Sequence, residues 1–480
     1  MSIEVATGAA PDELFGHPRG LTSLFATEMW ERFSYYGMRA LLTLYMVKYL
    51  LLPGRIETVA GLEPLRRVLE AALGPLAVQP LASQVYGLYT ALVYLTPLFG
   101  GLLADRVLGY RRTVVIGAVL MALGHFMMAF EWLFLPALLF LILGNGAFKP
   151  NISSQVGRLY PPGDRRRDRA YSIFYVGINI GAFLAPLVCG TLGQEAGWHY
   201  GFAAAGVGML IGLSIYLYAL PELPPDELQK AKAAHVERKP LDHDEWRAVI
   251  ALLVLFVPTT LFWATYEQGG NTIVLWADAN TDRTVDLFGL SGQIPTTWFL
   301  AFNPFMIFAF TPFVVALWTR QAARRREPAT ITKMALGCFG VALANLLMVA
   351  AAVHADGGKA SWLWLFGFFA VVTVGELYLS PVGLSLVTKI APARILSMMM
   401  GVWLATSFFG GFLAGYIGSF WSRMPKPEFF LVVAAIAALA GARLQSGRRH
   451  DQIGERHAKT AERHLGDGRR LRAARGLPSP

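Results

Sequence analysis

The chain contains about twelve apolar stretches, each close to the length that an α-helix needs to cross a bilayer. Lipid offers the backbone no hydrogen-bond partner, so segments of this kind span the membrane as helices. The pattern predicts an all-α polytopic membrane protein with about 12 transmembrane helices. The first six segments are 21–50, 81–104, 112–130, 132–152, 170–190 and 201–219, and the second six are 247–268, 296–318, 330–354, 361–388, 395–420 and 429–444.

The composition supports a membrane protein and argues against a soluble one. Hydrophobic residues make up 55% of the chain and charged residues only 15%, which leaves too little charge to cover the surface of a soluble protein of 480 residues. The formal net charge of +10 does not require a nucleic-acid partner. A membrane protein whose cytoplasmic loops are rich in Lys and Arg has a positive net charge of this kind.

Charged segments divide the chain into two halves and set its expected orientation. The predicted parts are a cytoplasmic N-terminal segment (1–20), a six-helix bundle (21–220), a cytoplasmic linker (221–246), a second bundle (247–444) and a basic tail (445–480). Alternate loops carry the basic residues, as in "GDRRRDR" (163–169) and "RQAARRR" (320–326). We expect both termini to be cytoplasmic in a multi-pass plasma-membrane protein.

The first outer loop and the C-terminal end of the chain do not follow this pattern. The first outer loop contains "LEPLRRVLEAALG" (62–74), which predicts an amphipathic helix lying on the surface. The last apolar stretch, 429–444, is short for a complete span and runs into a strongly basic tail. One interpretation is a short helix followed by a disordered tail attracted to anionic lipid. The other is that a frameshift has replaced the original end of the protein.

The first apolar segment carries ionisable side chains. Glu28, Glu31, Arg32, Tyr35 and Arg39 are spaced by three, one, three and four residues, which predicts one polar stripe on a helix. Charge at the bilayer centre costs about 2.5 kcal/mol or more per residue, so this stripe is expected to face a cavity or the protein interior. The alternative is a set of internal ion pairs that only hold helices together.

The expected depths of the charged residues suggest two pairings. Lys149 in the fourth segment is predicted to meet the Glu28 and Glu31 group, and Arg39 is predicted to meet Glu267 near the outer end of the seventh. An Arg39–Glu267 bridge is physically a gate. Opening would separate the carboxylate from its cation and so link protonation to opening.

Several motifs now resemble one family. "EMWERFSYYG" (28–37) resembles the first-helix motif of proton-dependent oligopeptide transporters, a family of the major facilitator superfamily. The similarity extends to further motifs in the expected order: "GGLLADRVLGYRR" (100–112), "GNGAFKPNISSQVGRLY" (144–160), "YSIFYVGINIGAFLAPLVCG" (171–190), "FWATYEQGG" (262–270), "WFLAFNPFMI" (298–307) and "GELYLSPVGLSLVTKIAP" (375–392). The resemblance spans about 21 to 425.

The resemblance implies the major facilitator fold, with a central cavity that binds di- and tripeptides and imports them with protons. It implies that Arg32 and Lys149 meet the peptide carboxylate and that Glu376 meets the amino terminus. Expected to complete the substrate site are Tyr35, Tyr94, Asn179, Asn303, Ser380 and Trp403, and the cytoplasmic gating loop contains Asp105 and Arg106. A cavity with cations on one half and a carboxylate on the other suits a zwitterion of variable sequence.

Other interpretations remain for the residues and for the function. Tyr35 and Trp403 could be core aromatic residues, and Asn303 could accommodate a kink at the following proline. A transporter of the same fold could move nitrate, amino acids or drugs instead. The sequence shows no metal-ligand cluster, no nucleophile–base pair and no phosphate-binding glycine loop, so we do not expect an enzyme. We also expect a monomer, with the proton as the coupling ion and no cofactor.

Overall fold

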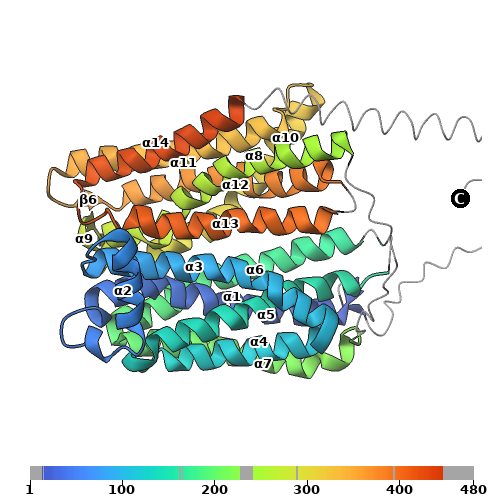
Figure 1. Cartoon of the computed structure of the whole chain (residues 1–480), viewed down its shortest axis with the longest axis horizontal. Helices are drawn as coiled ribbons and strands as arrows, with labels where there is room; N and C mark the ends of the chain where they lie inside the picture. The colour runs from blue at the N-terminus through green and yellow to red at the C-terminus, as the bar shows by residue number, and fades with distance from the viewer. Residues whose placement is uncertain are drawn as a thin grey trace, which may run out of the picture.

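The computed structural model describes residues 13–14, 16–161, 164, 166–226, 242–287, 290–392 and 395–446. Twelve long helices in this part of the chain run side by side in two bundles (Figure 1). The N-terminal bundle contains α1 (Arg19–Tyr45), α3 (Val78–Leu103), α4 (Tyr110–Met127), α5 (Phe134–Arg158), α6 (Arg166–Thr191) and α7 (Trp198–Ala219). The C-terminal bundle contains α8 (His243–Tyr266), α10 (Phe302–Ala323), α11 (Thr330–Ala355), α12 (Leu363–Ile390), α13 (Leu396–Gly418) and α14 (Lys426–Ser446).

Ten helices of the described residues are long and apolar enough to cross a membrane. The other two long helices, α1 and α4, lie within the N-terminal bundle (Figure 1). The five charged residues of α1, from Arg19 to Arg39, explain why composition alone does not mark it as a span. Each bundle has its own apolar core, one built mainly around α1, α3, α4 and α5 and the other around α8, α11, α12 and α14.

The last helix is longer than the sequence suggests. The apolar stretch 429–444 predicts a short helix, but α14 has 21 residues and extends from Lys426 to Ser446. At 1.5 Å per residue this is about 31 Å, which matches the hydrocarbon core of a bilayer. Its buried face includes Phe429, Phe430 and Val433. The predicted disordered tail covers 445–480 and the proposed frameshift begins after about 442, so both lie outside the described residues from 447 onward.

The two ends of the molecule carry different connections. One end, here called the α2 side, carries α2 (Leu62–Leu73), α9 (Thr272–Ala279) and β6 (Ala360–Ser361) (Figure 1). The other, the linker side, holds the start of α1 and the start of α8, where Asp242 and Glu245 form a capping box. The predicted amphipathic segment is confirmed as α2, which buries Leu62 and Leu69 and exposes Glu63 and Arg67.

Short strands occur in three two-stranded pairs among the described residues. β1 (Glu13–Leu14) and β2 (His17–Pro18) form an antiparallel pair on the linker side, next to the start of α1. β3 (Thr281–Asp282) pairs in parallel with β6, and β4 (Thr284–Leu287) pairs in antiparallel fashion with β5 (Leu290–Gln293). These pairs connect helices and do not form a sheet layer.

The seventh span is broken instead of ending where the sequence predicts. The apolar pattern places its end at 268, but the chain continues from α8 through a 3-10 turn, Glu267–Gly270, into α9. Asn271 lies between the turn and α9 with φ −110° and ψ −86°. The break places Glu267 between two helical pieces, which leaves its carboxylate free to point toward the neighbouring bundle.

Candidate functional site

The predicted contact between Arg39 and Glu267 is confirmed. The guanidinium of Arg39, on α1, forms an ion pair with the carboxylate of Glu267, in the turn after α8. Their side chains are 14% and 2% exposed. Because the two residues belong to different bundles, the pair joins the bundles across the seam between them.

Tyr86 on α3 is a third member of this contact, and the sequence motifs gave no sign of it. Arg39 donates to the Tyr86 hydroxyl from Nε at 3.1 Å and from Nη2 at 2.6 Å, and the hydroxyl donates to Glu267 at 3.3 Å. Tyr86 is completely buried. A Cβ on Gly270 would lie 2.2 Å from the Tyr86 oxygen, so the glycine leaves room for the phenol.

Contacts between the bundles gather on the α2 side. Thr43 donates to the Gly270 carbonyl at 2.9 Å, and Lys48 pairs with Asp278 at 2.9 Å. Gln194 donates to Thr297 at 2.8 Å. Between described residues, every hydrogen bond and ion pair that joins the two bundles lies in the half of the molecule nearer α2. The polar contacts between the bundles are therefore concentrated at one end.

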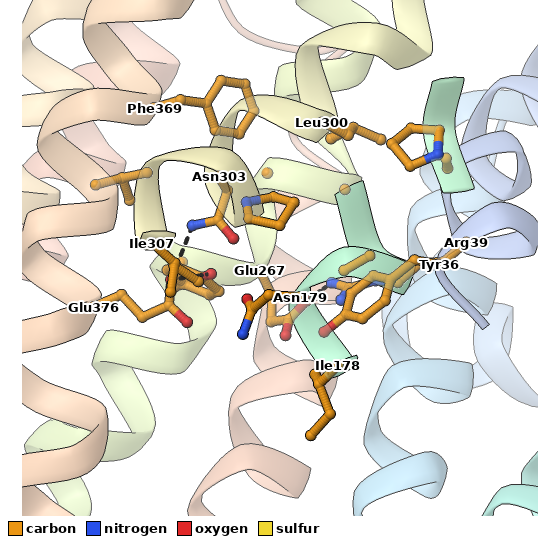
Figure 2. Close-up of a pocket in the computed structure, with 18 of the residues that line it drawn as sticks. Tyr36, Arg39, Ile178, Asn179, Glu267, Leu300, Asn303, Ile307, Phe369 and Glu376 are labelled. Atoms are coloured by element: carbon orange, nitrogen blue, oxygen red, sulfur yellow. Dashed lines mark hydrogen bonds and ion pairs between the residues drawn. The ribbon is translucent and has the colours of Figure 1, made fainter. Parts of the chain in front are cut away.

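A cavity of about 240 Å³ lies between the bundles beside the Arg39–Glu267 pair. Figure 2 shows Tyr36, Arg39, Asn179, Glu267, Asn303 and Glu376 around it. Its walls come from both bundles, so its shape depends on how the bundles sit together. The other lining residues are Ala40, Tyr94, Tyr175, Ile178, Ala182, Pro186, Trp263, Tyr266, Gly269, Gly270, Leu300, Pro304, Ile307, Phe368, Phe369 and Val372.

The wall from the C-terminal bundle carries a carboxylate held by two donors. Glu376 on α12 accepts hydrogen bonds from the Tyr266 hydroxyl at 2.7 Å and from the Asn303 amide at 2.9 Å. Asn303 also donates to Thr373 at 3.0 Å. The predicted residues Glu376 and Asn303 are therefore brought together at the cavity. Tyr266 and Thr373, which orient them, were not predicted.

The wall from the N-terminal bundle carries cationic and aromatic groups. Arg39, Tyr94 and Asn179 line the cavity as predicted, whereas Lys149 is not among the lining residues and its ammonium lies 5.5 Å from the centre of the Tyr94 ring. The Asn179 amide donates to the backbone carbonyl of Tyr175 on its own helix at 3.0 Å. Its side-chain oxygen therefore remains available to a ligand.

Tyr36, and not the predicted Tyr35, lines the cavity. Tyr35 is 4% exposed and packs edge-on against Tyr36, 5.0 Å from the Arg32 guanidinium carbon. Successive residues on a helix differ in direction by about 100°. Tyr36, Arg39 and Ala40 share the i, i+3, i+4 face that points inward, and Tyr35 lies at the side of this face, outside the cavity wall.

The linker-side part of the predicted stripe is closed off from the cavity. Arg32 forms ion pairs with Glu28, at 3.3 Å, and with Glu31, and these three side chains are at most 3% exposed. Asn145 on α5 donates to Glu31 at 3.4 Å. This part of the stripe therefore faces the protein interior, one of the two surroundings that the sequence predicts. Only its Arg39 end reaches the cavity wall.

The predicted pairing of Lys149 with Glu28 and Glu31 is not formed. Between described residues, Lys149 has no ion pair within 4.0 Å, because Arg32 on the same helix as the carboxylates occupies them. The second carboxylate oxygen of Glu28, Oε2, is buried without a hydrogen-bond partner among the described residues. The cluster therefore keeps one acceptor unsatisfied beside an unpaired cation.

Ser380 and Trp403 lie outside the cavity wall. Trp403 on α13 is 7% exposed, packs against Phe256, and fills the space over Gly383, where a Cβ would lie 2.1 Å from the indole. In this conformation it is a core aromatic residue. Ser380 is on α12, one turn beyond Glu376 toward the linker side.

The predicted gating loop is a π-helical turn, Ala104–Leu108, on the linker side. Asp105 accepts a hydrogen bond from the Tyr110 hydroxyl at 2.5 Å, and Arg106 is exposed. The described residues contain no group of three or more His, Cys, Asp or Glu side chains that could hold a metal ion.

Comparisons with known proteins agree with this architecture. The family model described as POT family matches residues 111–222 and 226–432. A di-/tripeptide transporter from Lactococcus lactis subsp. cremoris is 34% identical over 489 residues, which cover 89% of this chain and 94% of that protein.

Solved structures show the same fold. The crystal structure of a peptide transporter POT in complex with sulfate is 31% identical, with a TM-score of 0.79 over 93% of this chain and 98% of that one. The crystal structure of a POT family transporter in complex with a thioalcohol-conjugated peptide is 27% identical, with a TM-score of 0.79 over 92% and 98% of the two chains. The family model matches more than half of the chain and the similar proteins cover about nine tenths of it, so this chain belongs to the POT family, with the major facilitator fold.

Proposed function

We propose that this protein is a symporter that imports di- and tripeptides together with protons by alternating access. The observation that supports this best is the charge arrangement of the cavity. The N-terminal bundle contributes Arg39 to the wall, and the C-terminal bundle contributes Glu376. A zwitterion of variable sequence offers constant groups at its two ends and its amides, so a site with opposite charges on opposite walls recognises it with little regard for side chains.

The peptide amino terminus would meet Glu376. Its carboxylate is oriented by Tyr266 and Asn303, and each of these donors would remain in place when an ammonium group binds. The peptide carboxylate would lie toward the N-terminal bundle, where Lys149 stands beside Tyr94 with no anion within ion-pair distance among the described residues. Arg32 stands behind the wall, neutralised by Glu28 and Glu31. We propose that it reaches the peptide only after those carboxylates are protonated.

Proton coupling follows from the two carboxylate groups. Opening of the α2 side separates Glu267 from Arg39, so a proton on Glu267 would lower the cost of opening. Glu28 has a buried oxygen without a partner among the described residues, and we place a second exchangeable proton in the Glu28–Glu31–Arg32 cluster. The proton is then the coupling ion, and the proposal needs no cofactor and no chemical reaction.

The orientation is proposed from the basic loops. Arg111, Arg112, Arg166, Arg167 and Arg169 all lie at helix ends on the linker side. An excess of Lys and Arg marks the cytoplasmic face, so the linker side and both termini would be cytoplasmic. The structure would then be a state closed to the outside, in the inner membrane of a bacterium. We propose a monomer, because each chain contains both walls of its cavity.

The relatives favour peptides over the other solutes considered. The similar Lactococcus protein is named a di-/tripeptide transporter, and a related structure holds a conjugated peptide. Nitrate, amino acids and peptide-like drugs are the competing cargoes. Glu376 argues against nitrate as cargo, because a carboxylate on the cavity wall repels an anion.

Uptake into proteoliposomes tests the proposal. We expect labelled dialanine to accumulate when an inward proton gradient is imposed, and unlabelled di- and tripeptides, but not alanine or nitrate, to compete. Collapse of the gradient with a protonophore should abolish accumulation while leaving peptide exchange. Accumulation that ignores the gradient, or competition by nitrate or alanine alone, would rule the proposal out.

A further inference from the structure

The turn that carries Glu267 is held in place by its own bundle. Gln268 donates from Nε2 to the backbone carbonyl of Ala414, on α13, at 3.0 Å. Asn271 donates from Nδ2 to the same carbonyl at 3.4 Å. Gln268 lies within the turn and Asn271 directly follows it, so a single carbonyl of α13 holds both residues. Because α8, α9 and α13 all belong to the C-terminal bundle, we expect these bonds to persist when the bundles move.

A second set of bonds holds the same turn to the other bundle. Ser83 on α3 donates from its hydroxyl to Oδ1 of Asn271 at 2.8 Å. Ser83 and Asn271 are both completely buried. One turn earlier on α3, Gln79 donates to Ser83 at 2.8 Å and to the Gly418 carbonyl at 2.9 Å, and it accepts from the Ser422 amide at 3.1 Å. Asn271 is therefore bonded to helices of both bundles.

The space around the Asn271 amide fits it closely. A Cβ on Gly418 would lie 2.1 Å from Asn271 Nδ2 and 3.1 Å from Ser83 Oγ. Any side chain at position 418 would push the amide away from its partners. The contact thus depends on three residues from separate segments: Ser83, Asn271 and Gly418.

We infer that Asn271 is a positioning residue for the Arg39–Glu267 gate, and that its hydrogen bond to Ser83 favours the state closed on the α2 side. This inference rests on the alternating access of the proposed function. The Ser83 bond crosses the seam and is lost on opening, whereas the bonds to Ala414 are kept. A buried amide oxygen without its partner is unfavourable. Removal of the Ser83 hydroxyl therefore raises the free energy of the closed state relative to an open state in which water reaches the amide.

Spin-label distances across the α2 side test the inference. Cysteines replace exposed residues Val68, on α2, and Lys359, in the loop before β6, after the buried Cys189 and Cys338 are changed to alanine. Double electron–electron resonance then reports the ratio of open to closed molecules. We expect Ser83→Ala to raise this ratio roughly two- to tenfold, the size of one net hydrogen bond, and Gly418→Ala to raise it as well.

Matched variants separate the hydrogen bond from general damage. Ser34→Ala removes a hydroxyl from a serine that is equally buried but has no hydrogen-bond partner among the described residues. Gly367→Ala adds a Cβ whose nearest neighbour is Leu347, at 3.9 Å. Both controls should keep the parent ratio. The two test variants are independent, so the failure of one to fold still leaves the other to decide.

The outcomes distinguish this inference from the proposed function. A parent that takes up dialanine and shows two distances, with no change in Ser83→Ala or Gly418→Ala, overturns the role of Asn271 alone. A parent that shows one distance at low and neutral pH, with and without dialanine, overturns alternating access and the inference with it. An equal rise in the Ser34→Ala control also counts against the hydrogen bond.

Discussion

The guanidinium of Arg39 reaches across the seam to the carboxylate of Glu267, which joins α1 of one bundle to the broken seventh span of the other. Tyr86 closes this contact from a third helix. Both residues of the pair line the cavity. Under the proposed function, the contact would couple proton binding, peptide binding and opening of the α2 side.

Substitution of Glu267 by glutamine separates proton coupling from binding. The amide keeps the shape and a hydrogen-bond acceptor for Arg39 but neither ionises nor binds a proton in exchange. We expect Glu267→Gln to retain dialanine exchange and to lose accumulation driven by a proton gradient, down to the level without a gradient. Exchange and accumulation measured in the same proteoliposomes check this, and full accumulation by the variant would contradict it.

Loss of the Tyr86 hydroxyl should slow transport. Its oxygen accepts two N–H groups of Arg39 and donates to Glu267, so Tyr86→Phe leaves the guanidinium poorly oriented. A hydrogen bond to a charged group contributes about 1.5–3 kcal/mol, so we expect an initial uptake rate roughly tenfold lower or more. Tyr45→Phe is the control, because Tyr45 is equally buried and its hydroxyl has no partner among the described residues. Equal rates for the two variants would exclude a role for the Tyr86 hydroxyl.

Glu376 should determine the preference for a free amino terminus. Its carboxylate faces the cavity between Tyr266 and Asn303 and would pair with an ammonium group. We expect the parent to bind dialanine more tightly than N-acetyl-dialanine. In Glu376→Gln, the ratio of the two affinities should fall roughly ten- to hundredfold, which corresponds to one charge-assisted hydrogen bond. Competition against a labelled dipeptide measures both affinities. A preference that survives the substitution would place the amino terminus elsewhere.

The anchoring of α2 should depend on pH through Glu70. The Leu76 amide, at 2.9 Å, and the Arg66 guanidinium, at 2.8 Å, donate to its carboxylate and hold the pKa of Glu70 below its usual range. A lowered pKa means that this stabilisation is present above the unfolded pKa of about 4.3. It is lost as the pH falls through the lower folded value.

Hydrogen exchange of the Leu76 amide measures this effect. In Glu70→Gln the Leu76 amide should exchange faster than in the parent at neutral pH, relative to its intrinsic rate. In the parent, this loss of protection should occur only at acidic pH, where Glu70 becomes protonated. Glu63→Gln on the same helix is the control, because Glu63 and its partner Arg67 are 70% exposed. Protection of Leu76 that is equal in the parent and in Glu70→Gln at neutral pH would show that Glu70 does not anchor α2.

The sequence determined the fold class and one long-range contact. The apolar segments define the helices, because the length and composition of a spanning helix are set by the bilayer and not by its neighbours. The Arg39–Glu267 pair could be predicted because two opposite charges at one depth in an apolar medium strongly favour each other. Asn303 and Glu376 were likewise predicted at the cavity, and the structure places both there.

Only the tertiary structure decided which ion pairs and hydrogen bonds form and which helix faces point toward the cavity. Helical spacing predicts which residues share a face of α1. The rotation of α1 against its neighbours decides that Tyr36 lines the cavity and that Tyr35 packs beside it, outside the cavity wall. Arg32 and Lys149 are both possible partners for Glu28 and Glu31. The tertiary structure pairs both carboxylates with Arg32 and places the Lys149 ammonium near the Tyr94 ring. Tyr86 and Asn271 carry no charge that a sequence pattern would single out. Their roles arise because the packing of α3 against the broken seventh span brings each within hydrogen-bond distance of the other bundle, where burial excludes water as a substitute.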